Sequence, residues 1–199
     1  MFTGIVKEIG VVTYFSRYAK RENLMVRSKT LSASVNLGDS VSVNGVCLTA
    51  TKIKKPDMLV FDLLGETMEL TDLGLLKVGD NVNLEDSLKV NDKISGHFVT
   101  GHIDCLGVIK KKGIVNNNQA LEITIPKKFI NLLTPKGSVA IDGISLTIVN
   151  VFTDSFSVYI IPHTMENTIL NKKGIGSKVN IEFDILAKYA LNFKNPTVL

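Results

Sequence analysis

The chain has 199 residues, with 23 basic and 19 acidic side chains and a formal net charge of +4. Hydrophobic residues make up 45% of the chain, which is enough for a buried core and excludes general disorder. Two cysteines are too few for a disulfide scaffold, and no apolar run approaches the roughly 18 residues that span a bilayer. The first residues, MFTGIVKEIG, do not resemble a signal peptide. We therefore expect a soluble, cytoplasmic protein that does not bind membranes.

The mild positive charge does not indicate a nucleic-acid partner. The densest basic cluster is Lys110–Lys112, which Gly113 follows, and aromatic residues make up only 7% of the chain. Surfaces that bind nucleic acids usually interleave basic and aromatic side chains on one face, and the aromatic residues here do not cluster with the lysines. We interpret the three lysines as part of an exposed hairpin tip, with their charges directed into solvent.

Short strands separated by turns account for most of the chain. Apolar residues alternate with polar ones around 41–48 and 179–183, the pattern of half-buried strands. Glycine-containing turns interrupt the strands at Asn44-Gly45, Gly79-Asp80 and Asp142-Gly143. Helical patterns are brief and occur at residues 67–73, 125–137, 164–170 and 185–193. Short strands at regular spacing predict small closed barrels, which leave no exposed sheet edge.

The chain nearly repeats itself with an offset of 97 or 98 residues. Four collinear blocks carry the repeat, and they pair residues 2–12 with 99–109, 40–49 with 138–147, 67–73 with 164–170, and 78–85 with 175–182. A period of this length is a whole domain and not a solenoid unit. We therefore expect one barrel in residues 1–97 and a second in residues 98–199, with the linker at residues 86–95.

The last amphipathic segment has an apolar face without an assigned partner. This face is made of Ile185, Leu186, Tyr189, Ala190 and Phe193. It could pack on its own barrel or against the same helix of other subunits, and the pattern alone favours neither.

Polar groups occupy matching places in the two copies without being identical. Cys47 corresponds to Ser145, Thr49 to Thr147 and Ser40 to Ser138, whereas Ile5 corresponds to His102 and Glu66 to His163. Two similar pockets with different nucleophilic or proton-transfer groups suit one type of ligand held in two roles. The alternative is that Cys47 and Ser145 are small core residues, because free cysteine is among the most buried residue types.

Other common chemistries have no support in the sequence. His97 and His102 are five residues apart, which places them on opposite faces of a strand and not in a helical zinc pair, so no metal site is predicted. No phosphate-binding glycine motif and no G-x-S-x-G elbow is present. The residues by themselves therefore indicate a duplicated β-barrel with two similar polar pockets.

Four segments resemble the riboflavin synthase family of the α-chain type. They are MFTGIV at the N-terminus, SVNGVCLT at 42–49, GHFVTGHID at 96–104 and IDGISLT at 141–147, and the resemblance extends over essentially the whole chain. It implies an all-β fold of two tandem six-stranded Greek-key barrels with a short C-terminal helix, assembled as a homotrimer. It also implies a dismutation of two 6,7-dimethyl-8-ribityllumazine molecules, in which a four-carbon unit is exchanged.

The products of that reaction are riboflavin and 5-amino-6-ribitylamino-2,4-pyrimidinedione, and the family uses no metal or redox cofactor. By the same resemblance, the productive site joins the N-terminal barrel of one subunit to the C-terminal barrel of its neighbour, so that proximity of the two rings supplies much of the rate. The resemblance also suggests lumazine synthase as a partner with which the protein associates.

The resemblance also assigns substrate-binding residues to two pockets, in which backbone groups and hydroxyls would bind the polar edges of the ligand. The first pocket is predicted to contain Gly4, Ile5, Val6, Cys47, Leu48, Thr49, Asp62, Leu63, Leu64, Gly65, Glu66 and Thr67. The second is predicted to contain Gly101, His102, Ile103, Lys136, Ser145, Leu146, Thr147, Ile161, Pro162, His163, Thr164, Met165 and Glu166.

Catalytic roles follow from the chemistry of the lumazine. Its 7-methyl group is acidic, and a nucleophile that adds at C7 would activate the acceptor molecule. The hypothesis gives that addition to Cys47 or Ser40 and gives proton shuttling to His102. Ser145 and Thr147 would position the partner molecule. Asp184 matches a family carboxylate near the site, whereas Cys105 is expected to be an ordinary strand residue.

Two other functions fit a similar barrel. A non-catalytic antenna protein that binds lumazine or flavin would keep the barrels but lose parts of GHFVTGH and of the polar set, and this chain keeps both. A flavin reductase would need an R-x-Y-[ST] motif and a following nucleotide-binding domain. Arg17-Tyr18-Ala19 is not that motif, and the length leaves no room for the second domain.

Overall fold

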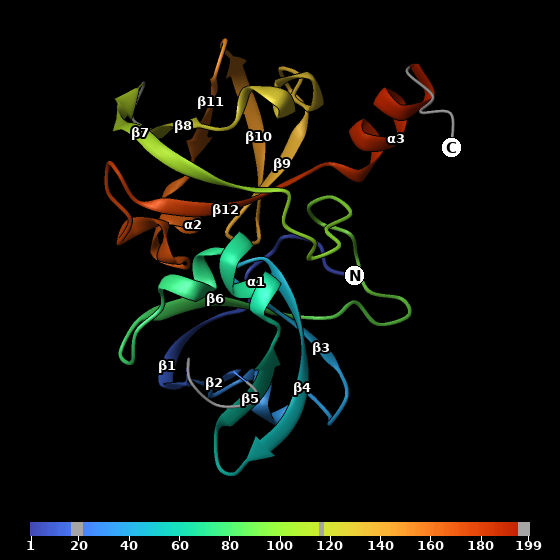
Figure 1. The fold of residues 1–199 in the computed structure, drawn as a ribbon, viewed down its shortest axis with the longest axis vertical. Helices are drawn as coiled ribbons and strands as arrows, with labels where there is room; N and C mark the ends of the chain where they lie inside the picture. The colour runs from blue at the N-terminus through green and yellow to red at the C-terminus, as the bar shows by residue number, and fades with distance from the viewer. Residues whose placement is uncertain (17–21, 116–117, 195–199) are drawn as a thin grey trace.

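The computed structural model describes residues 1–16, 22–115 and 118–194, and these form two closed six-stranded antiparallel barrels stacked end to end (Figure 1). The first barrel consists of β1 (Glu8–Ser16), β2 (Glu22–Arg27), β3 (Ser40–Val43), β4 (Val46–Lys54), β5 (Met58–Leu63) and β6 (Asn81–Asp86). The second consists of β7 (Cys105–Val115), β8 (Asn118–Thr124), β9 (Ser138–Ile141), β10 (Ile144–Val151), β11 (Ser155–Ile160) and β12 (Lys178–Phe183). The predicted all-β fold of two tandem barrels is confirmed.

Both barrels have the same Greek-key topology. Strands β3, β4 and β5 are consecutive neighbours and β6 returns to pair with β3, while β9, β10, β11 and β12 repeat this order. The predicted hairpin turns join β3 to β4 and β9 to β10. Asn44 and Gly45 adopt φ values of 48° and 83°, and Asp142 and Gly143 adopt 47° and 78°. Both residues of each turn thus lie in the left-handed region of backbone conformation, which matches the twist of the strands in a two-residue hairpin.

Short helices fill the connections, as the brief helical patterns predicted. The α-helices are α1 (Gly65–Leu70), α2 (Pro162–Glu166) and α3 (Ile185–Lys194), and the 3₁₀ helices are η1 (Leu31–Ala33), η2 (Asp72–Leu75), η3 (Lys127–Leu132) and η4 (Ile169–Asn171). No helix of the described residues is long and apolar enough to cross a membrane.

Each barrel encloses its own apolar core. Leu24, Phe61 and Leu84 are fully buried in the first barrel, and Phe156 and Ile141 are fully buried in the second. Burying one such side chain stabilises the fold by about 1.5–3 kcal/mol, so each barrel has a driving force of its own.

The lysine cluster does not lie at a hairpin tip, and that prediction is wrong. Strand β7 continues through Lys110–Lys112 to Val115, and the lysine charges are paired, although the side chain of Lys111 remains 72% exposed. Lys111 and Lys110 lie 2.9 and 3.0 Å from the carboxylate of Glu122, which they hold at a pKa of about 2. The ammonium of Lys112 donates to the carbonyl of Lys173 at 2.6 Å.

Two asparagines join the barrels about an approximate two-fold axis. Asn83 donates to the carbonyl of Asp142 at 2.9 Å, and Asn180 donates to the carbonyl of Asn44 at 2.8 Å. Each side-chain oxygen accepts a backbone N–H of the other barrel, from Ile169 in one case and from Asp72 in the other. Because all these groups are buried, the interface is specified by hydrogen bonds as well as by packing.

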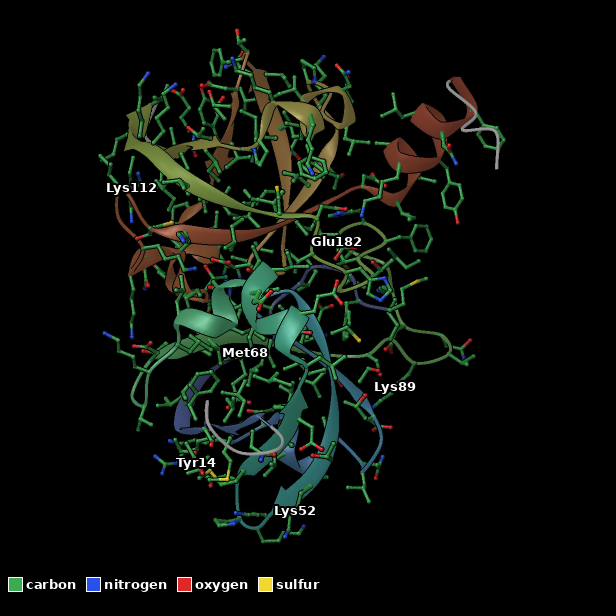
Figure 2. All side chains as sticks on the ribbon, in the orientation of Figure 1. Tyr14, Lys52, Met68, Lys89, Lys112 and Glu182 are labelled. Carbon is green, nitrogen blue, oxygen red and sulfur yellow. The ribbon has the colours of Figure 1, made fainter. Side chains whose placement is uncertain are left out.

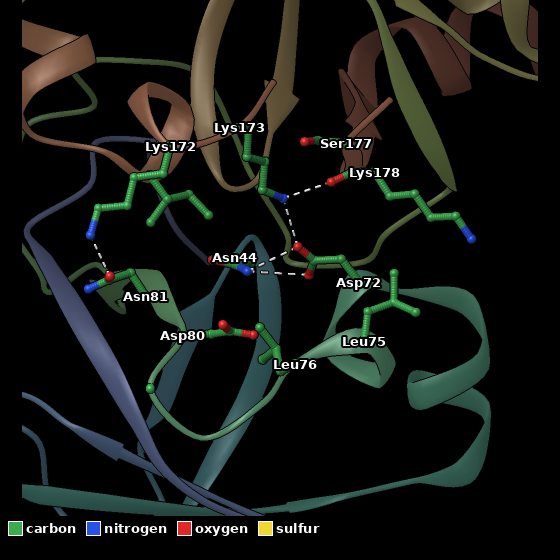
Figure 3. Close-up of a pocket in the computed structure, with 12 residues that line it drawn as sticks. Asn44, Asp72, Leu75, Leu76, Asp80, Asn81, Lys172, Lys173, Ser177 and Lys178 are labelled. Atoms are coloured by element: carbon green, nitrogen blue, oxygen red, sulfur yellow. Dashed lines mark hydrogen bonds and ion pairs between the residues drawn. The ribbon is translucent and has the colours of Figure 1, made fainter. Parts of the chain in front are cut away.

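One buried cation breaks this symmetry at the edge of the interface. The ammonium of Lys173 lies 2.9 Å from the carboxylate of Asp72 (Figure 3). It also lies 2.7 Å from the carboxylate of Asp142, whose side chain is fully buried. Burial raises the pKa of Asp142, and the nearby Lys173 only partly offsets this. The groove of about 360 Å³ beside the cluster contains none of the predicted site residues. Since the charged groups pair with one another, we interpret the cluster as part of the link between barrels.

Helix α3 follows β12 at the margin of the second barrel (Figure 1). It packs against η3 through the side that carries Ala187 and Leu191. Leu186, Tyr189 and Phe193 are 65%, 61% and 83% exposed. Of the two alternatives for this apolar face, packing on its own barrel is therefore wrong for these three residues.

Candidate active site

The paired polar residues lie on the outer wall of each barrel. In β4, Leu48 enters the core and is 6% exposed, so Cys47 and Thr49 on either side of it face outward. In β10, Leu146 is 8% exposed and divides Ser145 from Thr147 in the same way. Cys47 and Ser145 are both partly exposed, so neither is a fully buried core residue, although Cys47 also packs against the small buried cluster of Phe2, Val99 and Ala140. Leu48 and Leu146 offer a ligand only their backbones.

Hydroxyl groups from the neighbouring strand extend each polar face. Ser40 lies opposite Thr49 in the β3–β4 pair, and Ser138 lies opposite Thr147 in the β9–β10 pair. Residues directly opposite in an antiparallel pair have Cβ atoms about 5 Å apart, which places two hydroxyls side by side in each barrel.

The segments before β1 and β7 are exchanged relative to the predicted pockets. The backbone N–H of Cys47 donates to the carbonyl of Gly101 at 2.9 Å, and that of Ser145 donates to Gly4 at 2.8 Å. Ile103 packs on the core of the first barrel and Val6 on the core of the second. The predicted grouping of residues 4–6 with Cys47, and of residues 101–103 with Ser145, is therefore wrong.

The exchange follows from how the two segments meet between the barrels. Phe2 and Val99 form an antiparallel bridge, with N–H to O=C distances of 2.7 and 3.1 Å. From this bridge each segment continues along the barrel to which its own strand does not belong. Gly4 and Gly101 have φ values of 77° and 85°, and a Cβ on Gly101 would lie 2.4 Å from Cβ of Cys47. Only glycine allows this conformation at such a close approach.

A buried glutamate holds each exchanged segment in place. Glu182, at the end of β12 where the two barrels meet (Figure 2), accepts the N–H groups of Thr100 and Gly101 at 2.7 and 2.8 Å. Glu85 accepts those of Thr3 and Gly4 at 2.7 and 3.1 Å. Burial raises the pKa of Glu85, although the four backbone and hydroxyl donors oppose the rise.

These two glutamates were missed by the sequence reasoning although a signal was present. Glu85 and Glu182 end the repeated blocks 78–85 and 175–182, where a charged residue recurs in a strand that is otherwise buried. A carboxylate that the repeat keeps at a buried position needs donors, and the repeated Thr-Gly pairs supply them.

The connection after β5 and β11 supplies an exposed apolar residue next to each polar face. Leu64 and Ile161 precede α1 and α2, correspond in the repeat, and are 73% and 57% exposed. The other predicted residues of these two connections, except Leu63, are exposed or half-buried: Asp62, Gly65, Glu66, Thr67, Pro162, His163, Thr164, Met165 and Glu166. Leu63 is buried in the first core. Lys136 is exposed, and its N–H donates to the carbonyl of Ile148 in β10.

Each barrel thus carries a half-site made of three parts: an outward polar strand, a connection with an exposed apolar residue, and the segment exchanged from the other repeat. The first half-site contains Cys47, and the second half-site contains Ser145. Among the residues that the structure describes, no group of three or more His, Cys, Asp or Glu side chains could hold a metal ion.

The comparisons with known proteins agree with this duplicated architecture. The lumazine binding domain family matches residues 3–87 and again residues 100–184. The chain is 40% identical over 193 residues to the riboflavin synthase of Actinobacillus pleuropneumoniae, which covers 97% of this chain and 89% of that one. It is 38% identical to the riboflavin synthase of Bacillus subtilis, with the same shares covered. The chain belongs to the riboflavin synthase family.

Solved structures of a related protein share the fold. LumP in complex with 6,7-dimethyl-8-(1'-D-ribityl) lumazine superposes with a TM-score of 0.82 at 26% identity, over 92% of this chain and 99% of that one. LumP in complex with riboflavin superposes with a TM-score of 0.84. The two riboflavin synthases above are thus more similar to this chain in sequence than LumP is.

The remaining predicted residues of this family member are divided between the half-sites. His102 is exposed and follows Gly101, so it belongs to the first half-site with Cys47 and Ser40. Asp184 follows β12, and its carboxylate accepts the N–H of Leu186 at 3.0 Å, as an N-terminal cap of α3 does. Cys105 begins β7, where burial raises the pKa of its thiol to about 12, in agreement with a strand residue that takes no part in chemistry.

Proposed function

We propose that the protein converts two molecules of 6,7-dimethyl-8-ribityllumazine into riboflavin and 5-amino-6-ribitylamino-2,4-pyrimidinedione by transferring a four-carbon unit. The observation that carries the proposal is the pair of half-sites, which have the same construction but present a thiol at Cys47 and a hydroxyl at Ser145. Two copies of one substrate need two similar pockets, and unlike groups give the two copies different roles.

Each half-site would hold one lumazine on the outer wall of its barrel. The exposed side chains of Leu64 and Ile161 would cover the ring face, and the hydroxyls of Thr49 and Thr147 would bind its polar edge. The corrected sets are residues 47–49, 62–67 and 101–103 in the first half-site, and residues 4–6, 136, 145–147 and 161–166 in the second. Backbone groups of the exchanged segments would help to fix the orientation.

Catalysis would combine positioning with a few proton transfers. A base removes a proton from the 7-methyl group of one lumazine, and the resulting carbanion attacks the second lumazine, which a nucleophile at C7 activates. Cys47 and Ser40 are the candidate nucleophiles in the first half-site, and the exposed imidazole of His102 is the candidate proton carrier. Ser145 and Thr147 would position the other molecule, with Asp184 close to them. Holding both rings face to face supplies much of the rate.

The proposal includes a homotrimer in which the two half-sites of a productive pair come from neighbouring subunits. The exposed apolar face of α3, with Leu186, Tyr189 and Phe193, supports subunit contacts through this helix. The two free thiols are compatible with a reducing compartment, so we place the protein in the cytoplasm. Association with lumazine synthase rests on the family resemblance and is tested by co-sedimentation of the two purified proteins.

The deciding experiment mixes the purified protein with 6,7-dimethyl-8-ribityllumazine, without added cofactor, and follows flavin absorbance. The proposal predicts one riboflavin formed for every two lumazines consumed. Tight binding of lumazine without turnover would instead support the antenna function, which the fold shared with LumP makes the second candidate. One riboflavin formed for every lumazine consumed would contradict a dismutation.

A further inference from the structure

The second half-site contains a histidine that the catalytic hypothesis does not use. Nδ1 of His97 lies 2.7 Å from Oγ of Ser145, although the two residues are 48 positions apart. His97 is only 9% exposed. A contact this short between a ring nitrogen and a hydroxyl is a well-formed hydrogen bond.

The backbone around His97 leaves the ring little freedom. Its N–H donates to the carbonyl of Thr3 at 3.1 Å. The preceding residue, Gly96, lies so close that a Cβ there would be 2.0 Å from the carbonyl oxygen of Thr3 and 2.8 Å from Cβ of Ser145. The chain therefore brings His97 against Ser145 by a close approach that only glycine permits at position 96.

The first half-site has no equivalent of this contact. Cys47 takes the place of Ser145, and no side chain in the described part of the chain hydrogen-bonds its thiol. The two half-sites therefore differ in the group itself, a thiol at Cys47 and a hydroxyl at Ser145, and also in whether a side chain hydrogen-bonds that group.

The other ring nitrogen indicates which way the hydrogen bond runs. Nε2 of His97 is buried and has no hydrogen-bond partner among the described residues. A buried N–H without an acceptor is less tolerated than a buried acceptor without a donor, so the hydrogen of the neutral ring is placed on Nδ1. Burial lowers the pKa of His97, although the carboxylate of Asp184 opposes this, and the lowered pKa favours the neutral ring.

We propose that His97 is a positioning residue that donates its Nδ1–H to Ser145 and so leaves the hydroxyl hydrogen of Ser145 free for the ligand. The second half-site then presents a directed O–H donor to a carbonyl oxygen or ring nitrogen of the bound lumazine. The first half-site presents an unrestrained thiol at the corresponding place. This inference rests on the proposed function and deepens it, because it gives one physical cause for the unequal roles of the two half-sites.

The experiment compares His97→Leu, His97→Asn, Ser145→Ala and the double variant His97→Leu/Ser145→Ala. Asn places an amide N–H where Nδ1 stands, whereas Leu keeps apolar bulk without a donor. We expect His97→Leu to lower kcat/KM about tenfold, the usual effect of one lost directed hydrogen bond, and His97→Asn to recover most of it. We expect the double variant to be no worse than Ser145→Ala, because the histidine acts only through that hydroxyl.

Three results would overturn the proposal: wild-type kcat/KM in His97→Leu, losses that multiply in the double variant, or no recovery in His97→Asn. If His97→Leu does not fold, His97→Gln replaces it, because its amide reaches the place of Nε2 but not that of Nδ1. Riboflavin binding by each variant is measured in parallel. If the wild-type protein binds riboflavin but forms none from lumazine, the proposed function fails, and the same comparison of affinities still tests His97.

Discussion

Replacing Lys173 by methionine should weaken the link between the barrels strongly. The variant leaves the carboxylates of Asp72 and Asp142 buried without the cation that lies 2.9 and 2.7 Å from them. Removing one partner of a buried ion pair costs about 3–5 kcal/mol. Since about 1 kcal/mol corresponds to roughly 2–4 °C for a chain of this size, the melting temperature should fall by about 6–20 °C.

The matched control is Asp142→Asn, which removes the charge that faces Lys173 but keeps the side-chain oxygen that accepts the backbone N–H of Asn180. Oδ1 of Asp142 accepts the N–H of Asn180 at 2.7 Å, just as Oδ1 of Asn44 accepts that of Asn83 at 2.8 Å in the other repeat. An asparagine therefore fits this position, and Lys173 keeps Asp72 as its partner. We expect Asp142→Asn to cost less than Lys173→Met, because the remaining cation still has a carboxylate partner in Asp72.

The loss of stability in Lys173→Met should depend on pH, because Asp142 titrates in the folded protein. Burial raises the pKa of Asp142 to about 7 from an ordinary value of 3.8, so the folded state binds this proton more tightly than the unfolded state. Its contribution to stability is fully present below about pH 4 and is lost as the pH rises through 7. Without Lys173 the raised pKa rises further, so the loss in Lys173→Met should be larger at pH 8 than at pH 5.

Thermal and urea unfolding at one protein concentration, at pH 5 and pH 8, measure these differences. The reasoning is refuted if Lys173→Met loses less than about 1 kcal/mol at pH 8. It is also refuted if the loss is the same at both pH values, or if Asp142→Asn is as unstable as Lys173→Met.

Three further predictions concern the half-sites and the assembly. Glu182→Ala should weaken ligand binding about tenfold in the first half-site, and Glu85→Ala should do so in the second. Riboflavin titration of each variant, in a background in which the other half-site is blocked, measures this. The opposite assignment would contradict the exchange of segments. Gly101→Ala should lower the free energy of unfolding in urea by about 1–3 kcal/mol, because its Cβ would meet Cys47. Gly113→Ala, which has open space around it, should leave the free energy of unfolding nearly unchanged. Equal losses in the two variants would contradict this prediction. Leu186→Glu/Tyr189→Glu should convert the proposed trimer to monomers in sedimentation and lower turnover. An unchanged sedimentation coefficient would contradict a subunit interface through α3.

Much of the fold could be predicted from the repeat in the sequence. Four collinear blocks predicted two like barrels, and the Asn44-Gly45 and Asp142-Gly143 pairs predicted their hairpins, because local turn chemistry and strand periodicity act over a few residues. The lysines at 110–112 were misplaced because Lys110 and Lys111 pair with Glu122 on the neighbouring strand, and the local sequence does not reveal a cross-strand contact.

The site was harder to assemble than the fold. Aligning the two copies places Gly4 beside Gly101 and Cys47 beside Ser145 in the repeat, but it does not say which barrel a connecting segment touches. The bridge between Phe2 and Val99 decides this, and it is a contact between residues 97 positions apart. The contact of His97 is hidden from the sequence for the same reason, because the segment around it is not part of a strand and is held by Thr3 and Ser145.

Two half-sites that hold two lumazines and meet across subunits are the centre of the proposed mechanism. Thr49→Trp and Thr147→Trp place a bulky side chain on the outer wall of one half-site each, at exposed positions that correspond in the repeat. Each variant alone should form no riboflavin, because every productive pair lacks one half-site.

Unfolding and reassembling the two variants together tests this mechanism most directly. A mixed trimer contains interfaces where the intact first half-site of one subunit meets the intact second half-site of its neighbour. We expect riboflavin synthesis to return in the mixture, at a level set by the fraction of such interfaces. Full activity of either variant alone, or no activity in mixtures shown to contain mixed trimers, would contradict the mechanism.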